Sequence, residues 1–145
     1  MCIRDRLYQG KAQTQEVFSK EVMADLTYAL KSVVNGGTGS AALALGRPAA
    51  GKTGTSQSNA SAWFSAYTPQ LAASVALFRD SASESLNGIG GLTSVTGGTF
   101  PAKIWTYFMK RALKDEPIMT FPAPANIGGL EPIVMTSGGV QTRKK

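Results

Sequence analysis

The residues whose types and spacing could support chemistry lie together in one short segment, Lys52, Thr53, Gly54 and Thr55. The segment combines an ammonium group, two hydroxyls and a glycine, and it allows two interpretations. In the first, Gly46–Thr53 fits the pattern Gly-x-x-x-x-Gly-Lys-Thr of a nucleotide-binding loop. The backbone N–H groups of such a loop surround phosphates, and its lysine contacts the outer ones. This interpretation requires a helix to begin at Lys52 and Thr53, with its N-terminus facing the phosphates.

The sequence after Thr53 does not favour that helix. Residues 54–59 read Gly-Thr-Ser-Gln-Ser-Asn, a poor helix start without apolar periodicity. The next periodic segment alternates, which is typical of a strand. A P-loop nucleotide-binding domain therefore stays an alternative, favoured only if the residues after Thr53 prove helical.

Apolar periodicity predicts two helices that could position the segment. The first covers residues 19–34, with Ser19 as its N-cap and Gly36 among the residues that end it. The second covers residues 100–114, with Thr99 as its cap and a wide apolar stripe. Both helices are apolar on one side, so each is expected to lie on another element.

Three short segments predict strands, at residues 49–55, 62–67 and 71–78. The first carries the Lys52–Thr55 segment, and the other two have hairpin spacing. The third is apolar on both faces, which predicts that it is covered on both sides. Three strands are few to cover two broad helix faces, so the sequence is interpreted as part of a domain.

The second interpretation is Lys-Thr-Gly-Thr on a strand, the third active-site motif of serine transpeptidases and β-lactamases. Further segments agree with it in order: GGTG at 36–39, AWFSAYTP at 62–69 and TGGTFPAKIW at 96–105. From about Glu16 to Leu113 the chain resembles the transpeptidase domain of class A penicillin-binding proteins, the bifunctional peptidoglycan synthases. The resemblance implies an α+β fold, a fragment of the serine β-lactamase/transpeptidase-like fold. Its antiparallel sheet, with three strands here, would be covered by helices on both faces.

The resemblance also implies a role for each motif residue. The motif strand would be the sheet edge at the active-site cleft, to which an extended peptide can add. Gly54 would let the substrate main chain lie close. The hydroxyls of Thr53 and Thr55 would hold the carboxylate of a stem peptide ending in D-Ala-D-Ala, or of a β-lactam antibiotic. The Thr55 N–H would supply half of the oxyanion hole, and Lys52 would assist proton movement beside the nucleophile. Lys52 and Thr55 are thus the expected catalytic residues, and Thr53, Gly54 and Thr55 bind substrate.

Two other motifs of the family are a Ser-x-x-Lys, which supplies the nucleophile, and a Ser-x-Asn. No serine of the chain has a lysine three positions on, and Ser85–Asn87 matches Ser-x-Asn only after the Lys-Thr-Gly motif, so we interpret it as chance. We expect both motifs upstream of this chain. The parent protein would be a D,D-transpeptidase that cross-links peptidoglycan through a serine acyl-enzyme, and the chain alone would be inactive. A non-catalytic peptide-binding module is a further alternative.

Composition excludes several other kinds of site. The chain has no histidine, so Ser-His-Asp and Cys-His catalysis and imidazole metal ligands are excluded. Its single cysteine, Cys2, excludes a disulfide framework. We expect no cofactor and no metal. The net charge of +6 is spread over both ends and one helix, without a basic stripe interleaved with aromatics, so we expect no nucleic acid partner.

We expect three regions along the chain. Residues 1–6 connect to no later pattern and are interpreted as a cloning scar or a sequence-assembly artefact. Residues 7–115 would be the C-terminal part of a penicillin-binding transpeptidase domain, whose missing N-terminal part is an expected partner. Residues 116–145 hold four of the seven prolines and are interpreted as a disordered Pro/Gly-rich tail. The expected location is the bacterial cell envelope, at the outer face of the cytoplasmic membrane, with the anchor outside this chain.

Overall fold

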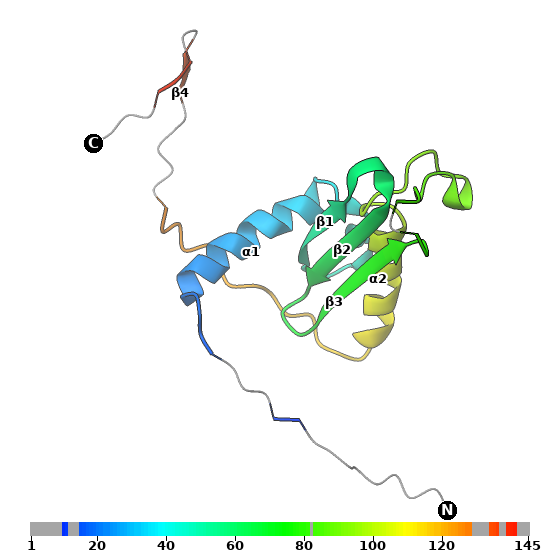
Figure 1. Ribbon diagram of the computed structural model, residues 1–145. Helices are drawn as coiled ribbons and strands as arrows, with labels where there is room; N and C mark the ends of the chain where they lie inside the picture. The colour runs from blue at the N-terminus through cyan, green and yellow to red at the C-terminus, as the bar shows by residue number, and fades with distance from the viewer. Residues whose placement is uncertain (1–9, 12–14, 82, 129–133, 137–138, 142–145) are drawn as a thin grey trace, which may run out of the picture.

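The computed structural model describes residues 10–11, 15–81, 83–128, 134–136 and 139–141. Two helices and a three-stranded sheet form its main part (Figure 1). These elements are α1 (Lys20–Asn35), β1 (Ala50–Thr55), β2 (Ser61–Tyr67), β3 (Ala72–Phe78) and α2 (Phe100–Ala112). Short 3-10 turns cover Ser40–Leu45, Gln57–Asn59 and Ile89–Gly91, and β4 (Val134–Thr136) pairs with β5 (Gly139–Gln141). None of the helices in the described residues combines the length and the apolar character needed to cross a membrane.

The three strands of the main sheet are antiparallel, in the order β1-β2-β3. The predicted strands at 49–55, 62–67 and 71–78 each agree with an observed strand to within one residue. The tight turn between β2 and β3 is closed by a hydrogen bond of 2.9 Å from the Thr68 N–H to the Leu71 carbonyl. In β2, Ala62, Phe64 and Ala66 are buried, while Trp63 and Ser65 on the other side are exposed. We call these the inner and the outer face of the sheet.

The helix termini agree with the prediction at α1 but not fully at α2. The Ser19 side chain caps α1 by accepting a hydrogen bond from the Val22 N–H, and the Gly36 N–H bonds the Ser32 carbonyl at the other end. The helix α2 begins as expected after Thr99, but the Thr99 hydroxyl does not cap it. It donates instead to the Thr96 carbonyl at 2.7 Å and closes the preceding loop.

The core lies between α2 and the inner face of the sheet. Trp105 of α2 is fully buried and meets the Phe64 ring edge-on, with ring centroids 5.4 Å apart. Its indole N–H donates to the carbonyls of Ala66 and Ala73, so α2 is bonded to both β2 and β3. Burial of both large rings, with the polar N–H satisfied, gives this contact much of its stability.

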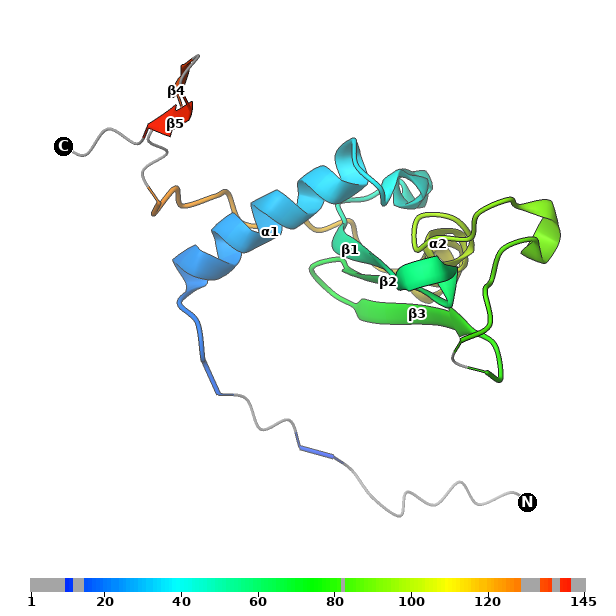
Figure 2. The same ribbon diagram turned by 45° about the horizontal axis from the view of Figure 1, so that its top comes forward.

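The helix α1 lies along the β1 side of the sheet, whereas α2 lies behind β2 and β3 (Figures 1 and 2). The Thr27 hydroxyl of α1 is 2.9 Å from the hydroxyl of Tyr67, which belongs to the outer face of β2. Helices therefore contact both faces of the antiparallel sheet, which confirms the predicted α+β fold. At β3, predicted to be covered on both sides, the described residues cover only the inner face: Phe78 on the outer face is 69% exposed.

After α2 the chain runs back along the sheet and α1. The guanidinium of Arg47 donates to the carbonyls of Leu113, Glu116 and Pro117, at 2.9, 3.3 and 3.4 Å. Further along, the Phe121 ring meets the Tyr67 ring edge-on, with centroids 5.5 Å apart. Residues 116–128, the described first part of the expected tail, contact the sheet through Phe121 and contact α1 through Asp25, which accepts hydrogen bonds from the N–H groups of residues 125–127. The division of the chain at residue 115 stays a prediction.

Candidate functional site

The motif residues Lys52, Thr53, Gly54 and Thr55 are the last four of the six residues of β1, the first strand of the sheet. Among the described residues, β2 is the one strand that pairs with β1. The Ser56 N–H bonds the Ser61 carbonyl at 3.0 Å. Because bonded and non-bonded positions alternate along an antiparallel pair, the backbone groups of Thr53 and Thr55 point away from β2. Thr53 and Thr55 therefore present their N–H and C=O groups along a sheet edge.

The two motif hydroxyls lie on the inner face of the sheet, opposite Phe64 and Ala62 in the register. The Thr53 Oγ1 is 2.7 Å from the Thr38 Oγ1, in the loop after α1. The Thr55 Oγ1 accepts a hydrogen bond of 3.2 Å from the Gly97 N–H, in the loop before α2. Each hydroxyl is therefore held by a different loop.

Lys52 lies on the outer face, opposite Ser65. Its Nζ donates to the Thr53 carbonyl at 3.0 Å, on the edge of β1 that points away from β2. In the described part of the chain, no carboxylate lies within ion-pair distance of Lys52. The lysine and the two hydroxyls thus point to opposite faces of β1 and share only its edge.

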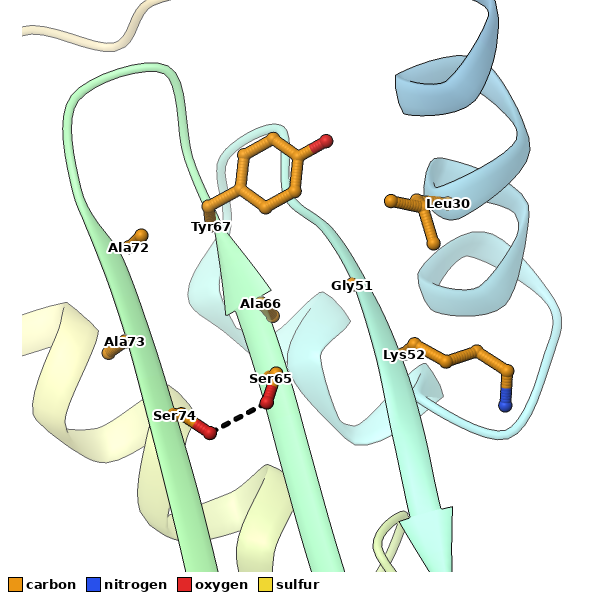
Figure 3. Close-up of a pocket in the computed structure, with 9 residues that line it drawn as sticks. All are labelled: Leu30, Gly51, Lys52, Ser65, Ala66, Tyr67, Ala72, Ala73 and Ser74. Atoms are coloured by element: carbon orange, nitrogen blue, oxygen red, sulfur yellow. Dashed lines mark hydrogen bonds between the residues drawn. The ribbon is translucent and has the colours of Figure 1, made fainter. Parts of the chain in front are cut away.

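An open groove of about 550 Å³ runs beside Lys52, between α1 and the outer face of the sheet (Figure 3). Leu30 of α1 points toward β1, and the Tyr67 hydroxyl points toward α1. The floor carries the hydroxyls of Ser65 and Ser74, which are 2.6 Å apart. The groove is thus largely apolar, with an ammonium group on one wall and a pair of hydroxyls on its floor.

Glycines allow the backbones around the motif to approach one another closely. A Cβ on Gly97 would lie 2.1 Å from the Trp63 carbonyl oxygen, and a Cβ on Gly98 would lie 2.1 Å from that of Thr38. A Cβ on Gly54 would lie 3.2 Å from the Trp63 Cβ, so Gly54 also has a packing reason to be glycine. The predicted site did not include Thr38, Gly97 or Gly98. The glycine pairs in the GGTG and TGGT segments were the available signal.

The nucleotide-binding alternative for Gly46–Thr53 is wrong. Lys52 and Thr53 belong to a strand that continues to Thr55, and the next helical residues are the 3-10 turn Gln57–Asn59. No helix N-terminus is therefore available to bind phosphates at Lys52. Within the described residues, no group of His, Cys, Asp and Glu side chains is arranged to hold a metal ion.

Comparisons with known proteins agree with the second interpretation. A family model described as the penicillin-binding protein transpeptidase domain matches residues 3–85, so the match begins within residues 1–6. The chain is 35% identical over 102 residues to penicillin-binding protein 1A of Rickettsia typhi, covering 70% of this chain and 12% of that protein. It is 39% identical over 106 residues to penicillin-binding protein 1A of Pseudomonas aeruginosa, covering 72% and 12%. The chain therefore spans about an eighth of these relatives.

Solved structures give the same result. The PonA1 protein of Mycobacterium tuberculosis in complex with penicillin V superposes with a TM-score of 0.68 at 35% identity, covering 76% of this chain and 30% of that one. Penicillin-binding protein 1A of Haemophilus influenzae superposes with a TM-score of 0.54 at 28% identity, covering 68% and 15%. The family model matches more than half of the residues, and β1 with its motif lies inside the match. The chain therefore belongs to the penicillin-binding protein transpeptidase domain family.

Proposed function

We propose that this chain forms the Lys-Thr-Gly side of a D,D-transpeptidase active site. The full-length protein, meaning the product of the complete reading frame around this chain, would cross-link peptidoglycan stem peptides ending in D-Ala-D-Ala and would bind β-lactams. The observation that carries the proposal is the motif's position on a sheet edge, with the backbone groups of Thr53 and Thr55 directed away from β2. The penicillin V complex of a relative supports β-lactam binding.

The edge of β1 would bind the peptide and stabilise the transition state. A stem peptide can add to it as an extended strand, and Gly54 leaves the strand without a side chain there. The Thr55 N–H would donate to the oxyanion that forms when the D-Ala carbonyl is attacked. Loss of one such donor lowers the rate by about 10²–10³-fold. The hydroxyls of Thr53 and Thr55 would donate to the C-terminal carboxylate of the peptide.

The nucleophile would come from the N-terminal part of the same domain. No Ser-x-x-Lys occurs in the 145 residues, so the attacking serine would lie on another segment. Its oxygen would attack the penultimate D-Ala carbonyl and release the terminal D-Ala, leaving a serine ester. The amine of a second stem peptide would then attack this ester and free the serine. Lys52, with its ammonium group at the edge of β1, would stabilise charge and assist proton transfer among the hydroxyls.

The expected place of this reaction is the bacterial cell envelope, at the outer face of the cytoplasmic membrane, where the substrate lies. The penicillin-binding proteins 1A that the chain matches support this location.

Fluorescent-penicillin labelling of the full-length protein tests the proposal. We expect covalent labelling of the wild type and a loss of at least about 100-fold in the labelling rate for Lys52→Gln, because the ammonium group is lost. Lys20→Gln, an exposed lysine at the start of α1, is the matched control and should label normally. Absence of labelling in the wild type would contradict the proposal. Reversible stem-peptide binding without labelling would instead support the non-catalytic peptide-binding module.

A further inference from the structure

We infer that Thr38 and the backbone N–H of Gly97 are positioning groups, which make Thr53 and Thr55 a pair of hydroxyl donors for the carboxylate of the ligand. The inference rests on the proposed function and adds two groups from loops outside the motif. Both groups contact motif hydroxyls directly, at 2.7 Å for Thr38 and 3.2 Å for Gly97.

At Thr55 the direction of the hydrogen bond is fixed by chemistry. A backbone N–H can only donate, so the Thr55 Oγ1 is the acceptor in its bond with Gly97. A hydroxyl has one proton to donate and two lone pairs that accept. The Thr55 proton is therefore left for another acceptor. Thr55 is exposed, so a ligand at the edge of β1 can reach it.

At Thr53 the ligand determines the direction of the hydrogen bond with Thr38. The geometry allows either hydroxyl of the Thr38–Thr53 pair to donate. A carboxylate is acceptor-only, so it binds Thr53 only when the Thr53 proton points to it. The Thr38 hydroxyl must then donate to Thr53. Thr53 and Thr55 are two positions apart on one face of a strand, about 7 Å along it, and one carboxylate between them can accept from both.

The backbone around these groups has little freedom to move. Thr38 stands between two glycines whose added Cβ atoms would each come within 2.9 Å of a neighbour, Val33 for Gly37 and Phe64 for Gly39. Gly98 packs on the Thr38 carbonyl, so the loop that supplies the Gly97 N–H also supports Thr38. Thr99 closes this loop through its hydrogen bonds with Thr96. The two loops therefore fix both positioning groups relative to β1.

The test compares ligands with and without a carboxylate in the full-length protein. The acylation rate constant is measured with penicillin G and with its methyl ester for the wild type, Thr38→Val, Thr38→Ala and Thr38→Ser. We expect Thr38→Val and Thr38→Ala to slow penicillin G acylation about ten-fold, and Thr38→Ser to stay within about two-fold of the wild type. For the ester, we expect all variants to stay within about two-fold. Thr93→Val, at an exposed threonine outside the site, is the matched control.

Equal slowing with penicillin G and with its ester would overturn the inference, because a general loss of structure affects both ligands. An unchanged rate in both Thr38→Val and Thr38→Ala would overturn it as well. If the wild type is not acylated at all, the proposed function fails and the inference fails with it, which separates the two results.

Discussion

Asp25 of α1 accepts a hydrogen bond of 2.9 Å from the backbone N–H of Asn126, 101 positions later in the chain. The same carboxylate accepts from the N–H groups of Ala125 at 2.7 Å and Ile127 at 2.9 Å. The hydrogen bonds from Asn126 and Ile127 hold the pKa of Asp25 below its ordinary value. The Asp25 side chain thus binds residues 125–127 to α1.

This attachment should depend on pH. Because the pKa of Asp25 is lower in the folded state than in the unfolded state, its contribution to stability is fully present above the ordinary value of about 3.8 and is lost as pH falls through the lowered pKa. At neutral pH we expect residues 125–127 of the full-length wild type to exchange more slowly than those of Asp25→Asn. We expect this difference to disappear as the pH falls through the lowered pKa of Asp25. Comparison with Asp25→Asn at each pH removes the intrinsic pH dependence of exchange. Equal exchange in both proteins at neutral pH would contradict the assignment.

The packing of Trp105 should matter more for stability than its hydrogen bonds. Trp105→Ala removes a fully buried side chain and should cost about 3–5 kcal/mol in free energy of unfolding. Trp105→Phe keeps most of the buried ring and loses the N–H that bonds Ala66 and Ala73, so we expect about 1 kcal/mol. Urea denaturation of the full-length protein, with the loss of penicillin labelling as the readout, measures the free energy of unfolding of both variants. An equal cost for the two variants would show that the hydrogen bonds dominate.

Gly97 should tolerate no side chain. A Cβ at this position would lie 2.1 Å from the Trp63 carbonyl oxygen and within 3.0 Å of the Gly54 backbone, none of which can rotate away. We expect Gly97→Ala to move the loop, break the bond to the Thr55 hydroxyl and lower both the melting temperature and the labelling rate. Gly36→Ala is the matched control, because a Cβ there meets nothing within 4 Å and its φ is extended. Normal labelling by Gly97→Ala would contradict the observed packing.

The isolated chain should not unfold cooperatively. On the outer face of the sheet, Trp63 and Phe78 are 44% and 69% exposed, and Leu26 of α1 is 47% exposed. Large apolar side chains in such numbers usually mark a surface that another element covers. Calorimetry of the 145-residue chain should therefore show a broad transition, and the chain should bind the dye ANS. A sharp melt without dye binding would contradict this prediction.

Local features of the fold could be predicted from the sequence. The strand β2 follows from its alternation, and the start of α1 follows from Ser19 and the apolar stripe, because these signals act within a few residues. The Lys52–Thr55 motif could be placed on a strand because residues 54–59 are a poor helix start and the next periodic segment alternates. The role of Thr99 was missed because its hydroxyl has two possible local partners, and it bonds Thr96 instead of capping α2.

Contacts between distant segments could not be predicted. The Gly97 N–H meets Thr55 across 42 positions, and Asp25 meets Ile127 across 102. No periodicity or spacing encodes such pairs, since they result from how the elements pack. The outer face of β3 shows the converse: its apolar residues predicted a cover that the described residues do not supply. A cover from the N-terminal part of the domain agrees with the proposed function.

The most direct test locates the penicillin adduct in the full-length protein. The protein is acylated with penicillin, digested, and the modified peptide is identified by mass spectrometry. We predict that the adduct lies on the serine of a Ser-x-x-Lys encoded upstream of Leu7, and that none of the serines within residues 7–145 is modified. An adduct on a serine within this chain, for example Ser65 or Ser74 beside Lys52, would contradict the account.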